Sequence, residues 1–413
     1  MKTFKNTLSE AAGKNTHMSH IEDLILDGGV KGARQAILAL RSLRDMLAGS
    51  AKSAVDVTVK WDGAPAVFAG EDPQTGEFFV AKKGIFAKNP KTYKSHEEID
   101  ADTSGDLAKK LKMAFDNLKD LGIKGVIQGD FMFDSSDLKS ANINGVKHTI
   151  FHPNTIAYAV PATSDIAKEI NKAKIGIVWH TVYTGATFET MRAEFGKEIV
   201  PKLRKSSNVW MVDATMPDLS GTVTLTAKET AELNSKLSES GKLFRKISAG
   251  VLKEIGENKE LNAVINIYNN TKVRQGQRIT DTKQHTLGLI QFVQDRYQKE
   301  IDKRSSDKGK QTQVVKRDDL LQFFSVNNRK NLQMVFDLQN LVVDSKLIII
   351  NKLNKLSNIG TFVKTKSGFK VTNPEGFVAI DRMEGGAVKL VDRLEFSTNN
   401  FSKDIIKGWD NPN

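Results

Sequence analysis

The residues best suited to chemistry lie in the stretch Val55–Gly70, around Lys60 in the tetrapeptide KWDG. Apolar and polar residues alternate from Val55 to Val59, which predicts a half-buried strand that ends at Lys60, just before a Gly/Pro turn. A lysine held at a strand end, with an acid and a glycine beside it, suits a nucleophilic amine. The alternative is an ordinary hairpin lysine that points into solvent, and four residues alone do not separate the two.

Composition limits the classes of function. The chain has 413 residues, which favours two or three domains. It has no cysteine, and this excludes disulfides, thiolate zinc sites and a cysteine nucleophile. Lys and Arg number 61 against 49 Asp and Glu, a net charge of +12, which favours a polyanionic partner such as nucleic acid or a nucleotide.

Two segments bear on location. The N-terminus lacks the apolar stretch of a secretory signal. The most apolar late segment, Leu341–Leu356, is interrupted by charged residues and predicts no membrane span. We therefore expect a soluble cytoplasmic protein.

Hydrophobic periodicity predicts the elements that would position Lys60. Two helices are expected within Ile21–Leu47, separated by a turn at Gly28-Gly29, and a third at Leu107–Leu121. Between the strands and this third helix, the polar segment Lys88–Asp106 is predicted to be a mobile loop. Further strands are expected at Glu77–Lys82, Gly125–Phe133, Thr155–Val160 and Ile175–Tyr183. This order predicts an α+β domain with largely antiparallel sheets.

The segment 188–358 is predicted to be mainly helical and is basic in places. One basic group contains Lys272, Arg274, Arg278 and Lys283, and a second surrounds a predicted polar loop and contains Lys303, Arg304, Lys308, Lys310, Lys316 and Arg317. Such groups form either solvated faces or a footprint on a phosphate backbone. Strand character returns from Thr361 to Val391.

Two smaller clusters could bind metal. His17 and His20 would share a helix face with Asp23, although capping and surface roles are commoner for such residues. Asp134 and Asp137, which follow the strand that carries Asp130, are predicted to be solvated turn acids.

Several short motifs, taken in order, resemble those of the covalent nucleotidyltransferases, the superfamily of ATP-dependent DNA and RNA ligases and mRNA capping enzymes. The KWDG at Lys60 resembles motif I (KxDG), and Glu375-Gly376-Phe377-Val378 resembles motif IV (EGxV). Weaker matches are Lys82-Lys83-Gly84, Gln128-Gly129-Asp130-Phe131 for motif III, Ile156-Ala157-Tyr158-Ala159 for motif IIIa and Val388-Lys389-Leu390-Val391 for motif V.

The resemblance implies a role for each matched residue. Lys60 would form a covalent lysyl-nucleotide, Glu375 would orient a metal or the nucleophile, and Lys389 would contact the α-phosphate. The nucleotide-binding residues would be Asp62, Gly63, Lys83, Asp130 near the ribose and Tyr158 stacked on the base. Because a lysine amine must be uncharged to attack, nearby cations and Mg²⁺ or Mn²⁺ would help to activate it.

Departures from the motifs refine the assignment. Asp130 replaces the usual Glu of motif III, Val391 replaces the second lysine of motif V, and no domain-sized segment follows Val391. The last point favours the RNA-ligase side, so RNA is expected as partner rather than DNA. The long interval between Asp130 and Glu375 predicts a helical insertion that binds substrate.

The resulting prediction is an α+β nucleotidyltransferase (ATP-grasp-like ligase) domain of antiparallel sheets flanked by helices, with a large helical insertion. Its parts are an N-terminal helical segment (1–50), a first catalytic part (51–187), a basic insertion (188–358), a second catalytic part (359–400) and a tail (401–413). The expected activity is ATP-dependent sealing of 5′-phosphate and 3′-hydroxyl ends, in which Lys272, Arg274 and Arg278 bind the nucleic acid. DNA sealing, GTP-dependent capping and non-catalytic nucleic-acid binding on the same fold remain alternatives.

Overall fold

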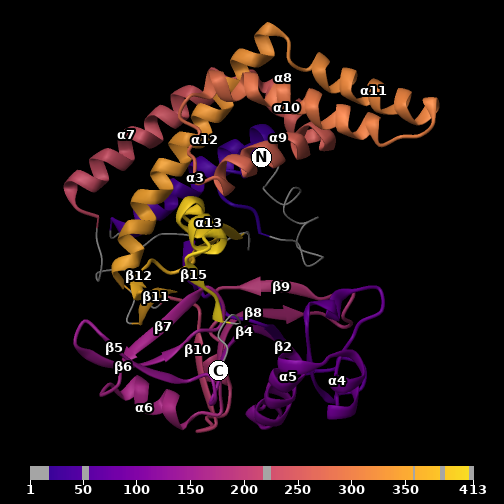
Figure 1. The fold of residues 1–413 in the computed structure, drawn as a ribbon. Coiled ribbons are helices and arrows are strands. Elements are labelled where there is room, and N and C mark those ends of the chain that lie inside the picture. Colours follow the sequence, from indigo (N-terminus) through magenta and orange to yellow (C-terminus); the bar gives the residue numbers. More distant parts are fainter. Residues whose placement is uncertain (1–17, 49–54, 217–224, 357–358, 382–386, 409–413) are drawn as a thin grey trace.

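The computed structural model describes residues 18–48, 55–216, 225–356, 359–381 and 387–408. The described chain is an α+β protein in which most helices gather in one half and most strands in the other (Figure 1). The predicted α+β class with largely antiparallel sheets is confirmed. Within these ranges, no helix combines the length and apolar character needed to cross a bilayer.

The helical half combines the N-terminal helices with those of the central segment. Helices α2 (Leu24–Asp27) and α3 (Gly29–Leu47) confirm the predicted pair. Gly29 separates them with a φ of +53°, and a Cβ there would lie 2.5 Å from the carbonyl oxygen of Leu252, so the turn needs glycine for both reasons. The other helices are α7 (Ala227–Phe244), α8 (Ala249–Glu257), α9 (Lys259–Arg274), α10 (Thr282–Asp302), α11 (Asp307–Gln322) and α12 (Val326–Leu353).

A six-stranded sheet contains most of the strands that the sequence predicts between Glu77 and Tyr183. Its order is β10-β8-β4-β2-β3, with β9 beside β8, and only the β10–β8 pair is parallel. The strands are β2 (Ala66–Glu71), β3 (Phe78–Ala81), β4 (Val126–Asp134), β8 (Ile175–Thr184), β9 (Arg192–Phe195) and β10 (Val209–Asp213). Helix α5 (Gly105–Leu118) buries Leu111 and Leu118 in the core that this sheet shares with it.

A second six-stranded sheet joins distant parts of the chain. Strand β11 (Gly360–Thr365) pairs with β7 (Ile156–Pro161), so that Thr361 lies opposite Tyr158. The sheet has the order β12-β11-β7-β6-β5, with β15 beside β11. Its remaining strands are β5 (Lys139–Ile143), β6 (Val146–Phe151), β12 (Gly368–Val371) and β15 (Ile405–Ile406), and helix α6 (Asp165–Lys172) packs beside β7.

A three-stranded sheet connects the two halves. It consists of β1 (Val55–Lys60), β13 (Gly376–Asp381) and β14 (Ala387–Leu390), all antiparallel. One face carries Val57, Phe377 and Leu390, which are buried in the core of the helical half. Because side chains alternate along a strand, Lys60 and Lys389 lie on the opposite face, away from the helices. Helix α13 (Arg393–Phe401) follows β14.

Three sequence expectations are wrong in detail. Helix α4 (His96–Asp102) begins inside the predicted mobile loop, where Ser95 accepts a hydrogen bond from the backbone of Glu98 and caps it. The strands continue past residue 188, because β9 and β10 pair with β8 and the helices begin only at Ala227. The second basic group lies largely on α11 rather than around a loop.

Candidate active site

The centre of the candidate site is an ion pair between Lys60 and Glu375. Lys60 ends β1 directly opposite Gly376, and its Nζ pairs with Oε2 of Glu375. The Lys60 side chain is 28% exposed and that of Glu375 only 9%. Burial raises the pKa of Glu375 to about 7, against the opposing charge of Lys60. The carboxyl group is therefore able to gain or lose a proton near neutral pH.

The Glu-Gly pair before β13 has a backbone reason. Gly376 has a φ of +155°, and a Cβ there would lie 2.6 Å from the carbonyl oxygen of Leu390. No other residue fits this close approach without displacing β14. Gly376 thus keeps β13 against β14 immediately after Glu375.

Two further lysines bring positive charge to the same region. Lys389 pairs with Val378 in β14, and its pKa is lowered by burial and, next, by the charge of Lys60. The charge of Lys83, in the short 3₁₀ helix η1 (Lys83–Phe86), lowers it further. Lys82, next to Lys83, instead pairs with Asp102 at 2.7 Å. The structure thus brings Lys60, Lys83, Glu375 and Lys389 into electrostatic contact.

Asp62 and Tyr158 hold the turn after Lys60. The carboxylate of Asp62 accepts hydrogen bonds from the amide of Asn154 at 2.6 Å and from the backbone of Thr155 and Ile156 at 2.8 Å each. The backbone N–H of Asp62 donates to the hydroxyl of Tyr158 at 2.7 Å. These contacts tie the KWDG turn to the start of β7.

Tyr158 is also packed among aromatic rings. Its ring centroid lies 4.9 Å from that of Trp61 and 5.4 Å from that of Phe151, both in stacked arrangements, and the residue is almost fully buried. The resemblance implies that Tyr158 stacks on a base, but in this structure its ring is covered by protein. Trp61, the second residue of the KWDG turn, is half-buried and covers one face of the Tyr158 ring.

Gly63 and Asp130 lie side by side on the wall of the site. A Cβ on Gly63 would lie 2.5 Å from the Cβ of Asp130, so only glycine fits beside this aspartate. The charge of Asp130 contributes to the raised pKa of Glu375. His180 of β8 places Nε2 3.8 Å from Oδ2 of Asp130, with both side chains partly exposed. The motifs do not include His180, which follows the buried Trp179 in a predicted strand and is the only charged or ionisable side chain there besides Tyr183.

The carboxylates fit a metal only together with a bound phosphate. Among the described residues, no three His, Cys, Asp or Glu side chains are arranged to hold a metal ion. Mg²⁺ in phosphate-transfer sites is usually held by one or two carboxylates plus substrate oxygens and water. Glu375 and Asp130 are the carboxylates that fit this pattern.

Asp134 does not belong to the site, and its predicted solvation is wrong. Its side chain is 1% exposed, pairs with Lys109 at 2.6 Å and accepts a hydrogen bond from the backbone of Ser136 at 2.7 Å. Asp137 in turn accepts from the backbone of Asp134 at 3.0 Å. The ion pair and the hydrogen bonds at the end of β4 offset the cost of burying the Asp134 carboxylate there.

Of the two histidines in the predicted cluster, the structure describes only His20. His17 lies outside the described residues. His20 forms a parallel bridge with Lys389, in which the backbone N–H of Lys389 donates to Ser19 at 3.0 Å. Burial lowers the pKa of His20 to about 3, so its ring is neutral at physiological pH. Residues 19–21 thus extend the three-stranded sheet beside β14.

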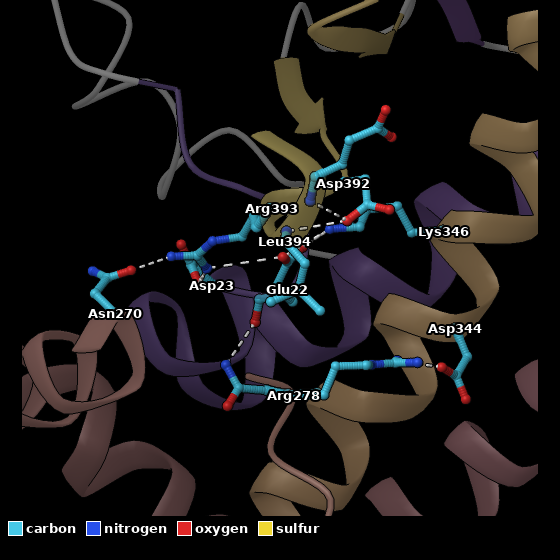
Figure 2. Close-up of polar contacts among 11 residues, drawn as sticks. Glu22, Asp23, Asn270, Arg278, Asp344, Lys346, Asp392, Arg393 and Leu394 are labelled. Atoms are coloured by element: carbon cyan, nitrogen blue, oxygen red, sulfur yellow. Dashed lines mark hydrogen bonds and ion pairs between the residues drawn. The ribbon is translucent and has the colours of Figure 1, made fainter. Parts of the chain in front are cut away.

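Next to this edge lies a group that we call the interhelical charge cluster, made of Glu22, Asp23, Lys346 and Arg393 (Figure 2). Lys346 of α12 donates to both carboxylate oxygens of Glu22, at 2.7 and 2.9 Å. Arg393 of α13 donates to Asp23 at 2.8 Å and also to Asn270 of α9. The cluster therefore ties the N-terminal segment, the helical half and the end of β14 together.

The three predicted nucleic-acid residues lie near the C-terminal end of α9, and each has a partner within the protein. Arg278 pairs with Asp344 at 2.5 Å (Figure 2). The charge of Lys272 lies 5.8 Å from the ring centre of Tyr268, and that of Arg274 lies 5.9 Å from that of Phe401. Arg274 and Arg278 are nevertheless exposed, so binding of nucleic acid by these residues stays a prediction.

The fold and site thus define an α+β protein with a strand-end lysine paired to a buried glutamate. The chain belongs to a family of unknown function, DUF6267, which it matches over residues 15–405. No curated protein and no solved structure matches it.

Proposed function

We propose that this protein is an ATP-dependent, RNA-ligase-like nucleotidyltransferase with Lys60 as its nucleophile. Lys60 would take AMP from ATP, pass it to a 5′-phosphate end, and a 3′-hydroxyl would then displace AMP to join the strands. The observation that carries the proposal is the ion pair between Lys60 and Glu375, with Lys389 on the same face of the three-stranded sheet. These residues come from segments more than three hundred positions apart.

The chemistry of the first step follows from this geometry. Glu375, whose pKa is near 7, accepts a proton from the Lys60 ammonium and leaves a neutral amine. The amine attacks the α-phosphorus, a P–N bond forms, and the bond to the bridging oxygen breaks as pyrophosphate leaves with the electron pair. Bound Mg²⁺ would offset charge on the phosphates. Lys389 and Lys83 supply further positive charge where the α-phosphate would lie.

The nearby residues support selectivity for a triphosphate held at the KWDG turn. Asp62 fixes the turn through three hydrogen bonds, and Gly63 lets the turn lie directly against Asp130, where a Cβ would not fit. An anion in this region would meet three lysines. Asp130 would help to hold a metal together with a bound phosphate, and Glu375 would do so only in its ionised form.

The proposal is tested by intact-mass spectrometry after incubation with ATP or GTP and Mg²⁺ or Mn²⁺, without any polynucleotide. We expect ATP to add the mass of one AMP, and this adduct to be lost in Lys60→Ala and in Lys60→Arg. The matched control is Lys124→Ala, which removes an exposed lysine paired with Glu71 far from the site. An adduct in the Lys60 variants, or none in the wild type under all four conditions, would refute the proposal. An adduct with GTP alone would favour capping chemistry.

A further inference from the structure

We propose that the hairpin of α10 and α11, over residues 296–317, binds the phosphate backbone of RNA. The identity of the polynucleotide rests on the proposed function, whereas the binding surface rests on the charge and exposure of this hairpin. In Figure 1 the hairpin extends away from the rest of the helical half.

The charge of the hairpin is strongly one-sided. Residues 296–317 contain eight basic and three acidic side chains. Two of the basic residues have partners, since Lys303 pairs with Glu300 and Arg317 with Asp318. Among the described residues, the other six are exposed and their side chains form no hydrogen bond or ion pair: Arg296, Lys299, Arg304, Lys308, Lys310 and Lys316. This is the pattern of charge that a phosphate backbone neutralises.

Helix α11 adds an independent observation. None of its residues from Asp307 to Asp319 is buried, and its only buried residue is Leu320 near the C-terminal end. Ser306 nevertheless caps it by accepting a hydrogen bond from the backbone of Gly309. Because no side chain from Asp307 to Asp319 is buried, packing in the core does not explain the basic composition of this part of the helix. Binding of an external polyanion does.

The spacing on α10 places basic groups in a row. Arg296, Lys299 and Lys303 are separated by three and four residues and therefore lie on one side of the helix. A row of this kind follows a backbone without reading bases. The hairpin thus contrasts with the α9 end, where Arg278 is already paired with Asp344.

The test compares two full-length variants with equal loss of charge. The hairpin variant carries Lys299→Gln, Arg304→Gln, Lys308→Gln and Lys310→Gln. The control variant carries Lys139→Gln, Lys147→Gln, Lys172→Gln and Lys174→Gln, all exposed residues in or beside β5, β6 and α6. Binding of a fluorescent single-stranded RNA, and of DNA of the same sequence, is measured by anisotropy over a range of salt concentrations.

We expect the hairpin variant to bind RNA about 10- to 100-fold more weakly, with a salt slope smaller by about 3, because each lost phosphate contact removes roughly 0.7 from the slope. The control variant should stay within about twofold, and both should keep the wild-type unfolding midpoint. Equal losses in the two variants, or no loss in the hairpin variant, would overturn the proposal. Tighter hairpin-dependent binding of DNA would overturn the choice of RNA.

These outcomes are separable from the proposed catalysis. Formation of the lysyl-AMP adduct is measured without polynucleotide, and the hairpin variant should form it as the wild type does. If no adduct forms but the hairpin variant loses RNA binding, the ligase proposal fails and the binding surface stands. If the adduct forms but the hairpin variant binds RNA as tightly as the wild type, the ligase proposal stands and the proposed binding surface fails.

Discussion

The protein contains two groups of buried charged residues, the interhelical charge cluster and the Lys60–Glu375 pair. They differ in how far neighbouring charges offset the cost of burying a carboxylate. In the interhelical charge cluster, Lys346 is 1% exposed and Glu22 6%, and two hydrogen bonds join them. Burial raises the pKa of Glu22, but the charges of Lys346 and Arg393 and the hydrogen bonds from Lys346 outweigh it and hold the pKa below its usual value. At the candidate site, burial instead wins and the pKa of Glu375 rises to about 7.

This difference indicates that the interhelical charge cluster stabilises the fold, whereas the Lys60–Glu375 pair is suited to proton transfer. Within that cluster the Glu22–Lys346 pair keeps its charges near neutral pH and holds segments together, whereas burial raises the pKa of the neighbouring Asp23 to about 6 in spite of the charge of Arg393. An incompletely compensated pair changes its protonation state near neutrality, which is what proton transfer requires. Lys60 is partly exposed, so a ligand can reach its amine, whereas the amine of Lys346 is enclosed by protein.

The largest effect on stability should come from breaking the interhelical charge cluster. Glu22→Ala leaves Lys346 buried without its partner, and we expect the free energy of unfolding to fall by about 3–5 kcal/mol. Lys60→Ala should cost about 1 kcal/mol or less, because Glu375 can take up a proton when its partner is lost. Urea unfolding at neutral pH measures both.

Glu232→Ala, which removes an exposed carboxylate on α7, is the control and should change stability by less than about 0.5 kcal/mol. The contrast between the two charge groups would be wrong if Lys60→Ala were as costly as Glu22→Ala.

A smaller effect should distinguish the two groups by pH. The carboxyl of Glu375 loses its proton near pH 7 in the folded chain and near 4.5 when unfolded. The folded state therefore binds more protons between these values, and the stability of the wild type should fall as pH rises through that range. Relative to Glu375→Gln, the loss should approach about 3 kcal/mol at pH 8. Thermal unfolding of both proteins at pH 4, 6 and 8 measures it, and a difference that does not depend on pH would contradict the raised pKa.

The strands that meet at the site were predictable because each carries a local pattern. Alternation at Val55–Val59 and the apolar runs of β4, β8 and β13 are set by burial on a sheet, so the sequence locates them within a few residues. The ordered motifs also placed Lys60, Glu375 and Lys389 in one group. The pairing of β1 with β13 joins segments that are far apart in the sequence. The order of the motifs suggested this pairing, whereas hydrophobic periodicity, which is local, did not.

Other features depend on tertiary contacts that no local pattern contains. Asp134 is buried because Lys109 of α5 reaches it, although the flanking serines resemble a solvated turn. Tyr158 lies under Trp61 because the KWDG turn folds over β7. The charge on Arg278 is taken by Asp344 of α12, which is 66 residues away. In each case a distant partner decides the role of a residue whose type is clear from the sequence.

The smallest predicted effect concerns how α13 supports the site. Glu395 accepts hydrogen bonds from the hydroxyl of Thr372 at 2.9 Å, and from the backbone and side-chain amides of Asn373 at 3.1 and 2.7 Å. These contacts fix the turn that leads into Glu375, and Glu395 and Glu375 line one small cavity. Glu395 is therefore a positioning residue, acting through the turn rather than on a ligand. Glu395→Gln keeps the shape, but it weakens the two hydrogen bonds to Oε1 and removes the acceptor for the side-chain amide of Asn373, so we expect a loss of about 1 kcal/mol in stability.

The readout that tests positioning is the pH dependence of lysyl-AMP formation. With Glu375 as proton acceptor, the wild-type rate should rise about tenfold per pH unit below 7 and level off above it. If Glu395 sets the environment of Glu375, Glu395→Gln should shift this midpoint as well as lower the plateau. Glu254→Gln, an exposed change on α8, should leave both unaltered. An unmoved midpoint would contradict the positioning role, because a merely structural loss of about 1 kcal/mol leaves the protein folded and does not alter the pH at which Glu375 gives up its proton.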